Sequence, residues 1–497
     1  FAESISLLMQ EHEPSAGPQL SPKLKEQLEQ VRERIAETGT DLSSSIIESR
    51  YEWIRSVMAK TDPKGPTHEN EPPGATAKVD RIVMHPVFGY MLFLFVMALI
   101  FQAIFTWAKY PMDWIKTAMD WAGGLLVNHM PAGDLRDLIK DGVLGGVGTT
   151  ITFLPQILLL FFFISLLEDT GYMSRAAFLM DKLMSKVGLH GRSFIPLLSS
   201  FACAIPGIMA TRTISNRKAR LITILIAPLM SCSARIPVYA LMIGAFIPAK
   251  AVISIGGHGI VHLPGLVLLS MYVLGMVFAF LFALLFHRTL LKGDAPIFLM
   301  ELPPYRLPSL KTACLQMIER AWQFVYRAGT MILAISVVLW ALTTYPKHPE
   351  LPEGQRKQYS FVGNAGRFIE PVLKPMGFDW KMGIGIIASF AAREVFVSAM
   401  GTVYNVDATD DKGKVDLQSR MRADVDPTTG KPVYTPLVAI CVMIYYVLAM
   451  QCMSTVVVVR RETGTWSWPL FQIAYMTGLA WVVTTVVYQV GRFAGWG

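Results

Sequence analysis

The chain has 497 residues, of which 53% are hydrophobic and only 16% charged, against about 25% charged in a typical soluble domain. The mean hydropathy is +0.42, so the composition excludes an ordinary soluble globular fold and indicates a polytopic membrane protein. The net charge of +8 requires no nucleic-acid partner, because membrane proteins retain basic residues on their cytoplasmic loops. The five cysteines contain no CxxC pair and therefore indicate neither a disulfide framework nor a zinc site.

The first 84 residues are polar, and we expect a cytoplasmic helical spacer at 1–60 followed by a linker at 61–84. Apolar residues recur at helical spacing from Leu24 to Ile35. Pro and Gly are then frequent, as is typical of a linker. The chain opens with "FAESISLLMQ", which contains no signal peptide, so we expect it to continue a longer protein.

Seven apolar runs approach or exceed the roughly 20 residues that a spanning helix needs. They cover 86–107, 151–167, 219–247, 264–287, 328–345, 434–459 and 468–490. The sequence therefore predicts an all-α membrane protein. We divide its membrane part into a first transmembrane helix with a periplasmic amphipathic segment at 85–148, a first repeat at 149–290, a cytoplasmic loop at 291–327 and a second repeat at 328–492.

The stretch "SSFACAIPGIMATRT" (199–213) interrupts the first repeat with residues that disfavour a continuous helix, including Pro206 and Gly207. Basic residues lie on both sides of it and place both flanks in the cytoplasm. We therefore expect residues 193–211 to enter the bilayer and return. Such irregular backbone is tolerated only where protein or a water-filled cavity surrounds it. The alternative is a spanning helix kinked by proline.

The sequence contains an internal repeat. An offset of 189 residues aligns "SFACAIPGIMATRT" with "SFAAREVFVSAMGT", pairing Ser200 with Ser389, and upstream it pairs Gly188 with Gly377. An offset of 220 then aligns "LMSCSA" with "AMQCMS". The 31 extra residues correspond to a polar loop at 404–433. Repeats at fixed offsets indicate a duplicated architecture.

We expect each repeat to hold one broken element and three spanning helices. Since three crossings are an odd number, the second repeat must be inverted relative to the first. Two inverted repeats whose broken helices meet near the middle of the membrane are typical of secondary transporters.

The repeats bring metal-ligating residue types to related positions. Cys203 occupies the first break, Cys232 and Cys452 are repeat-related and each follows a methionine by two residues, and Glu394 is an acid within a membrane segment. An intramembrane acid is a functional candidate by default, and sulfur ligands with a carboxylate suit Fe(II), Cu(I) or Zn(II). The predicted metal-ligating residues are Cys203, Cys232, Cys452, Glu394, Glu168, Asp169, Met230 and Met450.

Each of these residues also has a structural alternative. A buried cysteine is often a small apolar filler, and methionine is more often packing than ligand. Glu394 can instead form an ion pair with Arg393 or Arg235. Glu168 and Asp169 end an apolar run, where they either gather cations or are solvated helix ends.

The motifs that carry these residues resemble the FeoB family of prokaryotic ferrous iron transporters. The likeness rests on "FLPQILLLFFFISLLEDTGYMSRAAFLMDKLMSKVGLHGRSFIPLL", "APLMSCSARIPVY", "REVFVSAMGT" and "LAMQCMSTVVVVRRETG" and covers about 85–490. "SLLMQEHEP" and "SRYEWI" resemble the helical spacer that follows this family's GTP-binding domain.

The resemblance implies ferrous iron uptake across the bacterial cytoplasmic (inner) membrane. In the family, cysteines that match Cys203, Cys232 and Cys452 are proposed to conduct iron. The sequence has no GxxxxGK[ST] motif, so the chain resembles the membrane half. It is then not itself an enzyme, and GTP and Mg belong to a GTPase domain that precedes it. The implied partners are Fe(II), the lipid bilayer, a small cytoplasmic accessory protein and further copies in a homo-oligomer, with no nucleic acid.

One departure leaves the choice of metal open. The family's first break commonly reads Gly-Cys-Asn-Val-Pro, whereas here Ala202 precedes Cys203 and Ala204 follows it, so the Asn amide is lost. Manganese and zinc are therefore alternatives. A carrier of nucleoside-like solutes is a second alternative, which predicts clustered Asn, Gln, Ser and Thr. A membrane-anchored GTPase signalling protein is a third, which needs no polar breaks in the membrane.

Overall fold

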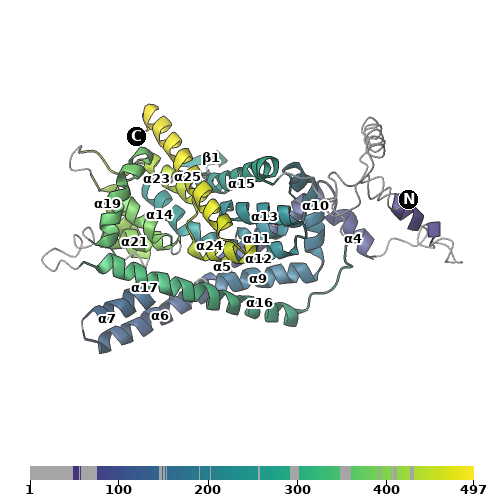
Figure 1. Ribbon diagram of the computed structural model, residues 1–497, viewed down its shortest axis with the longest axis horizontal. Helices are drawn as coiled ribbons and strands as arrows, with labels where there is room; N and C mark the ends of the chain where they lie inside the picture. Colours follow the sequence, from purple (N-terminus) through teal and green to yellow (C-terminus); the bar gives the residue numbers. More distant parts are fainter. Residues whose placement is uncertain are drawn as a thin grey trace, which may run out of the picture. The chain divides into compact units, whose positions relative to one another are not determined.

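A computed structural model gives the fold of the chain (Figure 1). It describes residues 49–54, 56–57, 75–131, 133–144, 148, 151–152, 154–189, 191–201, 203–255, 258–291, 302–346, 360–390, 393–404, 406, 411–425 and 430–496. The chain divides into two compact units, one of residues 1–82 with 296–301 and one of residues 83–295 with 302–497. The predicted spacer helix at 24–35 lies outside the described residues.

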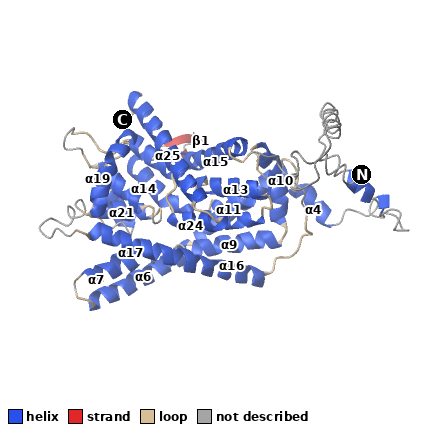
Figure 2. Ribbon diagram, viewed as in Figure 1, coloured by secondary structure: helices blue, strands red, loops and turns tan. Residues whose placement is uncertain are grey.

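Almost all the described elements are helices, as the apolar runs predict (Figure 2). The chain begins with α4 (Ala75–Val83), α5 (Phe88–Trp107), α6 (Lys109–His129), α7 (Asp134–Asp137), the π-helix η2 (Leu138–Leu144), α9 (Leu154–Asp169) and α10 (Tyr172–Lys186). The first repeat continues with η3 (Gly191–Ser193), α11 (Phe194–Ser200), α12 (Ala204–Ala210), η4 (Thr211–Thr213), α13 (Arg217–Ile226), η5 (Ala227–Leu229), η6 (Ser233–Arg235), α14 (Ile236–Phe246), β1 (Ala251–Ile255), β2 (His258–His262) and α15 (Leu263–Thr289).

The second repeat follows a segment that we expected to be a loop. Part of 291–327 forms α16 (Leu310–Phe324), which packs along α9 and receives there a hydrogen bond from Ser165 Oγ to Gln316 Oε1 (2.8 Å). The remaining elements are η7 (Val325–Gly329), α17 (Thr330–Thr344), α19 (Phe361–Leu373), η9 (Lys374–Met376), α20 (Trp380–Ala388), α21 (Val395–Val403), α22 (Asp411–Arg422), α23 (Pro436–Leu448), α24 (Met453–Thr463) and α25 (Ser467–Phe493). The short antiparallel hairpin β1–β2 was not expected.

The helices include several that can cross a membrane. In the described part of the chain, five are long and apolar enough, and the pair α9 and α10, bent by 85°, is a sixth candidate. The five cover Phe88–Leu126, Arg217–Phe246, Leu263–Thr289, Pro436–Thr463 and Ser467–Phe493. The prediction of an all-α polytopic membrane protein is therefore confirmed, and the inverted orientation of the second repeat stays a prediction.

The first broken element folds back on itself. A Cβ added at Gly207 in α12 would lie 2.7 Å from the carbonyl oxygen of Pro196 in α11. Eleven residues of straight helix would separate these positions by about 16 Å. The chain therefore reverses between α11 and α12, as expected for a re-entrant element, and a kinked continuous helix does not describe it.

The corresponding contact occurs in the second repeat. A Cβ at Gly385 in α20 would lie 2.6 Å from the ring of Phe396 in α21, and these two residues lie 189 positions after Pro196 and Gly207. The paired serines also agree, because Ser200 Oγ donates to Pro196 O (2.8 Å) and Ser389 Oγ donates to Gly385 O (2.6 Å). The aligned sequences thus form the same local structure.

The paired glycines agree as well. Gly188 and Gly377 have φ of +73° and +78°, a left-handed conformation that costs glycine little. Each packs against the last helix of its own repeat, Gly188 against His287 at the end of α15 and Gly377 against Tyr488 of α25. A side chain at either position would be both strained and obstructed.

The extra loop of the second repeat holds a helix that contacts both repeats. Arg422, at the end of α22, donates to the carbonyl oxygens of Gly244 (2.6 Å) and Ala245 in α14. Asp424 receives hydrogen bonds from Lys381 (2.5 Å) and Tyr404. The insertion therefore links α14 of the first repeat to the start of α20 in the second.

Candidate functional site

Four predicted site residues each lie directly before a helical element at a break. Cys203 precedes α12, Cys232 precedes η6, Glu394 precedes α21 and Cys452 precedes α24. The three cysteines have extended backbone, with φ between −155° and −81°. The apolar runs 219–247 and 434–459 are thus interrupted at Cys232 and Cys452, the repeat-related positions.

The structure brings these four side chains together. The Cys203 thiol interacts electrostatically with Cys232, Cys452 and Glu394, and Cys452 interacts with Cys232 and Arg393. The helices agree with this, since α12 of the first repeat packs on α24 of the second (Figure 1). The three thiols are half-buried and free. Within the described ranges, however, no three His, Cys, Asp or Glu side chains converge closely enough to hold one metal ion.

Two buried arginines complete the breaks, and sequence reasoning missed their role. Arg235 is fully buried and donates from Nη1 to Met230 O (2.7 Å) and from Nη2 to Pro228 O (2.7 Å). These carbonyls end the half-helix that precedes Cys232. Such groups have no intrahelical partner and carry about half a negative charge together, so the guanidinium both satisfies and neutralises them.

Arg393 does the same at the second break. It is 4% exposed and donates to the carbonyl oxygens of Tyr446 (3.0 Å) and Ala449 (3.2 Å), which end α23 before Cys452. The charge of Arg393 also acts on Glu394 and on Arg235. Both arginines thus donate to main-chain carbonyls. The alternative considered for Glu394 was instead an ion pair with one of these arginines. The sequence signal that points to Arg393 is a basic residue within a membrane segment, directly before the acid Glu394.

Side chains of α25 bond the remaining carbonyls at the first break. Gln472 Nε2 donates to the oxygens of Ile224 (3.1 Å) and Leu225 (2.8 Å), and Tyr475 Oη donates to Leu225 O (2.6 Å). An unpaired backbone group at membrane depth costs several kcal/mol. These bonds therefore allow α13 to end within the membrane part of the protein.

Polar side chains beside two of the thiols are also buried. Ser231 and Gln451 are related by the offset of 220 and are both 0% exposed. Within the described residues, the Ser231 hydroxyl and both polar atoms of the Gln451 amide have no hydrogen-bond partner of acceptable geometry, and the same holds for Ser454 Oγ. The nearby Tyr446 hydroxyl is already bonded to Ser389 (2.5 Å). The hydroxyls of Tyr239 and Tyr446 interact with Ser231 and Gln451, respectively, so both breaks place polar side chains directly before a thiol.

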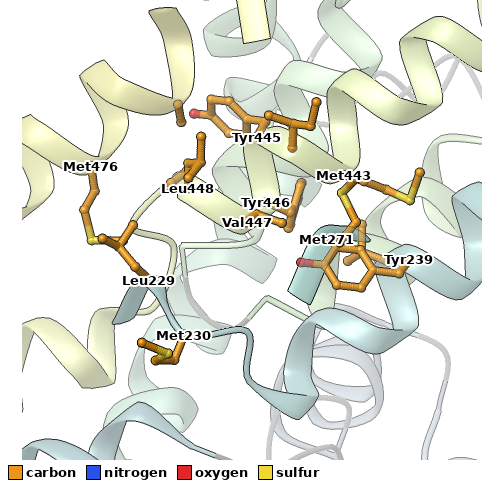
Figure 3. Packing of buried hydrophobic residues seen from close by; sticks show 14 of the residues in the cluster. Leu229, Met230, Tyr239, Met271, Met443, Tyr445, Tyr446, Val447, Leu448 and Met476 are labelled. Atoms are coloured by element: carbon orange, nitrogen blue, oxygen red, sulfur yellow. The ribbon is translucent and has the colours of Figure 1, made fainter. Parts of the chain in front are cut away.

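Both predicted methionine ligands lie in the hydrophobic core. Met230 and Met450 are 2% and 1% exposed and belong to one cluster of buried residues. Figure 3 shows Met230 on the segment that leads away from Leu229. Their packing role is evident, and a role as metal ligands stays a prediction.

Glu168 and Asp169 lie away from this group, at the C-terminal end of α9. Glu168 is exposed and Asp169 half-buried, next to the sharp turn where Gly171 adopts φ +79°. Arg175 stabilises this turn by donating to Gly171 O (3.0 Å) and to Pro303 O (2.5 Å). The two acids are accessible for collecting cations, a role that stays a prediction.

Two family models match the chain. "Gate: Nucleoside recognition" matches residues 150–246 and 325–466, and "Ferrous iron transport protein B C terminus" matches 268–320. The first model therefore covers Cys203 and Cys232 in one repeat and Glu394 and Cys452 in the other. Its match to both halves agrees with the repeated local structure.

Curated relatives extend the match over most of the chain. The Fe(2+) transporter FeoB of Leptospira interrogans (serogroup Icterohaemorrhagiae serovar copenhageni) is 46% identical over 423 residues, which are 83% of this chain and 59% of the relative. This chain belongs to the FeoB family. The FeoB of Staphylococcus aureus (strain COL) is 41% identical over 84% of the chain and 59% of its own length.

A third FeoB relative is a fusion. The "Fe(2+) transport protein A/Fe(2+) transporter FeoB fusion protein" of Porphyromonas gingivalis is 41% identical over 91% of this chain and 55% of the relative. The chain thus spans somewhat more than half the length of these FeoB relatives. No solved structure matches it.

Proposed function

We propose that this chain is the membrane part of a ferrous iron transporter of the bacterial cytoplasmic (inner) membrane. The observation that carries the proposal is the packing of α12 on α24, with Cys203 close enough to interact electrostatically with Cys232, Cys452 and Glu394. The names of relatives 41–46% identical to this chain support iron as the cargo.

The chemistry of the site suits a divalent metal in transit. Thiolates and a carboxylate together match borderline cations such as Fe(II). A conducting site must bind weakly enough to release its ion. Ligands spread over several breaks would provide a series of low-affinity binding sites along the path. Fe(II) enters from the periplasmic side, meets Glu394 and the thiols near the middle of the bilayer, and leaves toward Glu168 and Asp169.

The intact protein needs parts that lie outside this chain. A preceding domain that binds GTP and Mg regulates or drives the passage of iron through the spacer. The fusion relative, whose name joins transport protein A to FeoB, supports a small cytoplasmic accessory partner for this chain. Assembly into a homo-oligomer is a further proposal.

A nucleoside-like solute is the second candidate cargo. It is favoured by the description of the family model, "Nucleoside recognition", and by the buried polar side chains of Ser231 and Gln451 beside the thiols. Another divalent metal, manganese or zinc, fits the same thiols. The test must therefore offer all of these solutes.

The decisive experiment is anaerobic uptake into liposomes by the full-length protein. Wild type is compared with Cys203→Ser, Cys232→Ser and Cys452→Ser, with Fe(II), Mn(II), Zn(II) and a labelled nucleoside supplied separately. Each of the three substitutions should reduce Fe(II) uptake at least about tenfold, because serine replaces a soft ligand with a hard and weak one.

Two other cysteines provide matched controls. Cys314 is exposed on α16, and Cys441 is buried in α23, so Cys314→Ser and Cys441→Ser should transport as wild type does. Uptake unchanged in all three test variants removes the thiol path. Nucleoside uptake without metal uptake supports the second candidate, and uptake of no solute favours a signalling protein.

A further inference from the structure

We propose that Arg235 and Arg393 are positioning residues, each of which fixes the thiol that follows the half-helix it caps. Arg235 would fix the position of the Cys232 thiol, and Arg393 would fix that of the Cys452 thiol. The inference rests on the proposed function, because it assigns these two arginines to the thiol path.

The two breaks share one geometry. Each thiol lies two or three residues beyond carbonyls bonded to a buried guanidinium: Met230 O precedes Cys232, and Ala449 O precedes Cys452. Between carbonyl and thiol the backbone is extended and has no helical hydrogen bonds of its own. The position of the thiol therefore depends on where the preceding half-helix ends.

Arginine is suited to bonding two carbonyls at once, and lysine is not. A guanidinium has five donors in a planar fork, so one side chain can bond two carbonyls that point in different directions. Both arginines use two arms in this way. A lysine ammonium carries the same charge but is a compact point charge, which does not reproduce the fork.

The two repeats differ in where the capping arginine comes from. Arg235 follows the break that it caps, so the first thiol and its cap belong to one segment. Arg393 comes from the other broken element, where it adjoins Glu394, and it reaches across to α23. A movement of Glu394 is therefore transmitted to Cys452 by Arg393, while Cys232 has no such connection through Arg235.

The test measures the reactivity of each thiol separately. The full chain in proteoliposomes is treated with N-ethylmaleimide, and alkylation of the peptides that contain Cys203, Cys232 and Cys452 is followed by mass spectrometry. The variants are Arg393→Met and Arg393→Lys against Arg235→Met and Arg235→Lys, so that each arginine serves as the matched control for the other.

Arg393→Met removes both hydrogen bonds of the guanidinium. It should change the alkylation rate of Cys452 by at least about tenfold, which corresponds to about 1.4 kcal/mol, and leave Cys232 within about twofold. Arg235→Met should do the reverse. The lysine variants should give smaller changes at the same thiol, and they carry the test if a methionine variant does not fold. Equal changes at all three thiols, or no change at the capped thiol, overturn the proposal.

Failure of this inference and failure of the proposed function give different results. The alkylation pattern requires no transport, so it can hold in a protein that takes up no Fe(II), in which case the proposed function alone fails. Conversely, Fe(II) uptake that depends on the thiols, together with an unselective alkylation pattern, removes the role of the arginines and leaves the iron path in place. In the expected case, Arg393→Lys also raises the Fe(II) concentration that gives half-maximal uptake, whereas a merely structural defect lowers the maximal rate alone.

Discussion

Arg220 Nη2 lies 2.9 Å from Glu462 Oε2 and thereby joins α13 of the first repeat to α24 of the second. Arg212 binds the same carboxylate through Nε (2.9 Å) and Nη2 (2.5 Å). The Glu462 side chain is 3% exposed, while those of Arg212 and Arg220 are 54% and 30% exposed. One buried carboxylate therefore ties the end of the first broken element and α13 to the end of α24.

Removing this charge should loosen the tie. Glu462→Gln should destabilise the protein by about 1–2 kcal/mol, less than for a fully buried pair because both arginines reach solvent. The measurement is the Tm in detergent. The control is Asp416→Asn, which breaks a half-exposed pair with Arg420 (3.2 Å) within α22 and should change stability by less than about 0.5 kcal/mol. Equal shifts in the two variants would contradict the assignment.

The reversal between α11 and α12 predicts an effect for a single methyl group. Gly207→Ala places a Cβ against Ser200 and Pro196 and should cost about 1–3 kcal/mol, as overpacking does. Gly478→Ala in α25 meets no atom within 4 Å and should be neutral or stabilising, because alanine favours helices. Thermal unfolding of both variants tests this. If Gly207→Ala is as stable as Gly478→Ala, the close packing of the re-entrant element is wrong.

Asp379, at the start of α20, predicts a pH dependence. Burial raises the pKa of the Asp379 carboxyl above its ordinary value, against the lowering effects of the Met382 N–H, the Tyr434 hydroxyl and Lys381, while Asp424 adds to the rise. The folded protein thus holds this proton more tightly than the unfolded chain does. The resulting stability is fully present below the ordinary carboxyl pKa and is lost as the pH rises through the raised value.

The corresponding variant is Asp379→Asn, which retains an oxygen for Met382 N (3.0 Å) and Tyr434 Oη (3.0 Å). It should have a higher Tm than wild type at about pH 7.5, and the difference should shrink as the pH is lowered toward the ordinary carboxyl pKa. A Tm measured across this range decides the sign. A difference that grows on acidification would show that ionised Asp379 is the favoured form.

Gln451 predicts opposite effects on stability and transport. Gln451→Leu removes a buried amide whose two polar atoms have no partner among the described residues, so stability should rise by about 1–3 kcal/mol. Uptake should fall, because the Gln451 amide lies directly before Cys452 in the proposed path of the ion. Thermal unfolding and liposome uptake of the same preparation test both halves. Lower stability with normal uptake would show that Gln451 has a structural role.

Composition and periodicity predicted the helical membrane fold, since apolar runs of spanning length have few alternatives in a chain of this length. The repeat offsets predicted which residues share a local structure, as Ser200 and Ser389 show. Both predictions depend on short-range patterns that sequence records directly.

The caps of the breaks could not be predicted in this way. Arg393 bonds carbonyls more than 50 positions away, and neither helical nor strand periodicity encodes a contact at that distance. The helix α16 was missed because the segment from His287 to Arg327 was interpreted from its basic charge as a cytoplasmic loop, and its packing on α9 is a contact between distant parts of the sequence.

The contacts of α22 form a surface that an antibody fragment could recognise. Because α22 bonds α14 through Arg422 while Asp424 holds Lys381, an antibody fragment that recognises these segments together would bind only while they remain joined. Such a fragment would report by its affinity whether the two halves have separated, and it would add mass for imaging a small membrane protein.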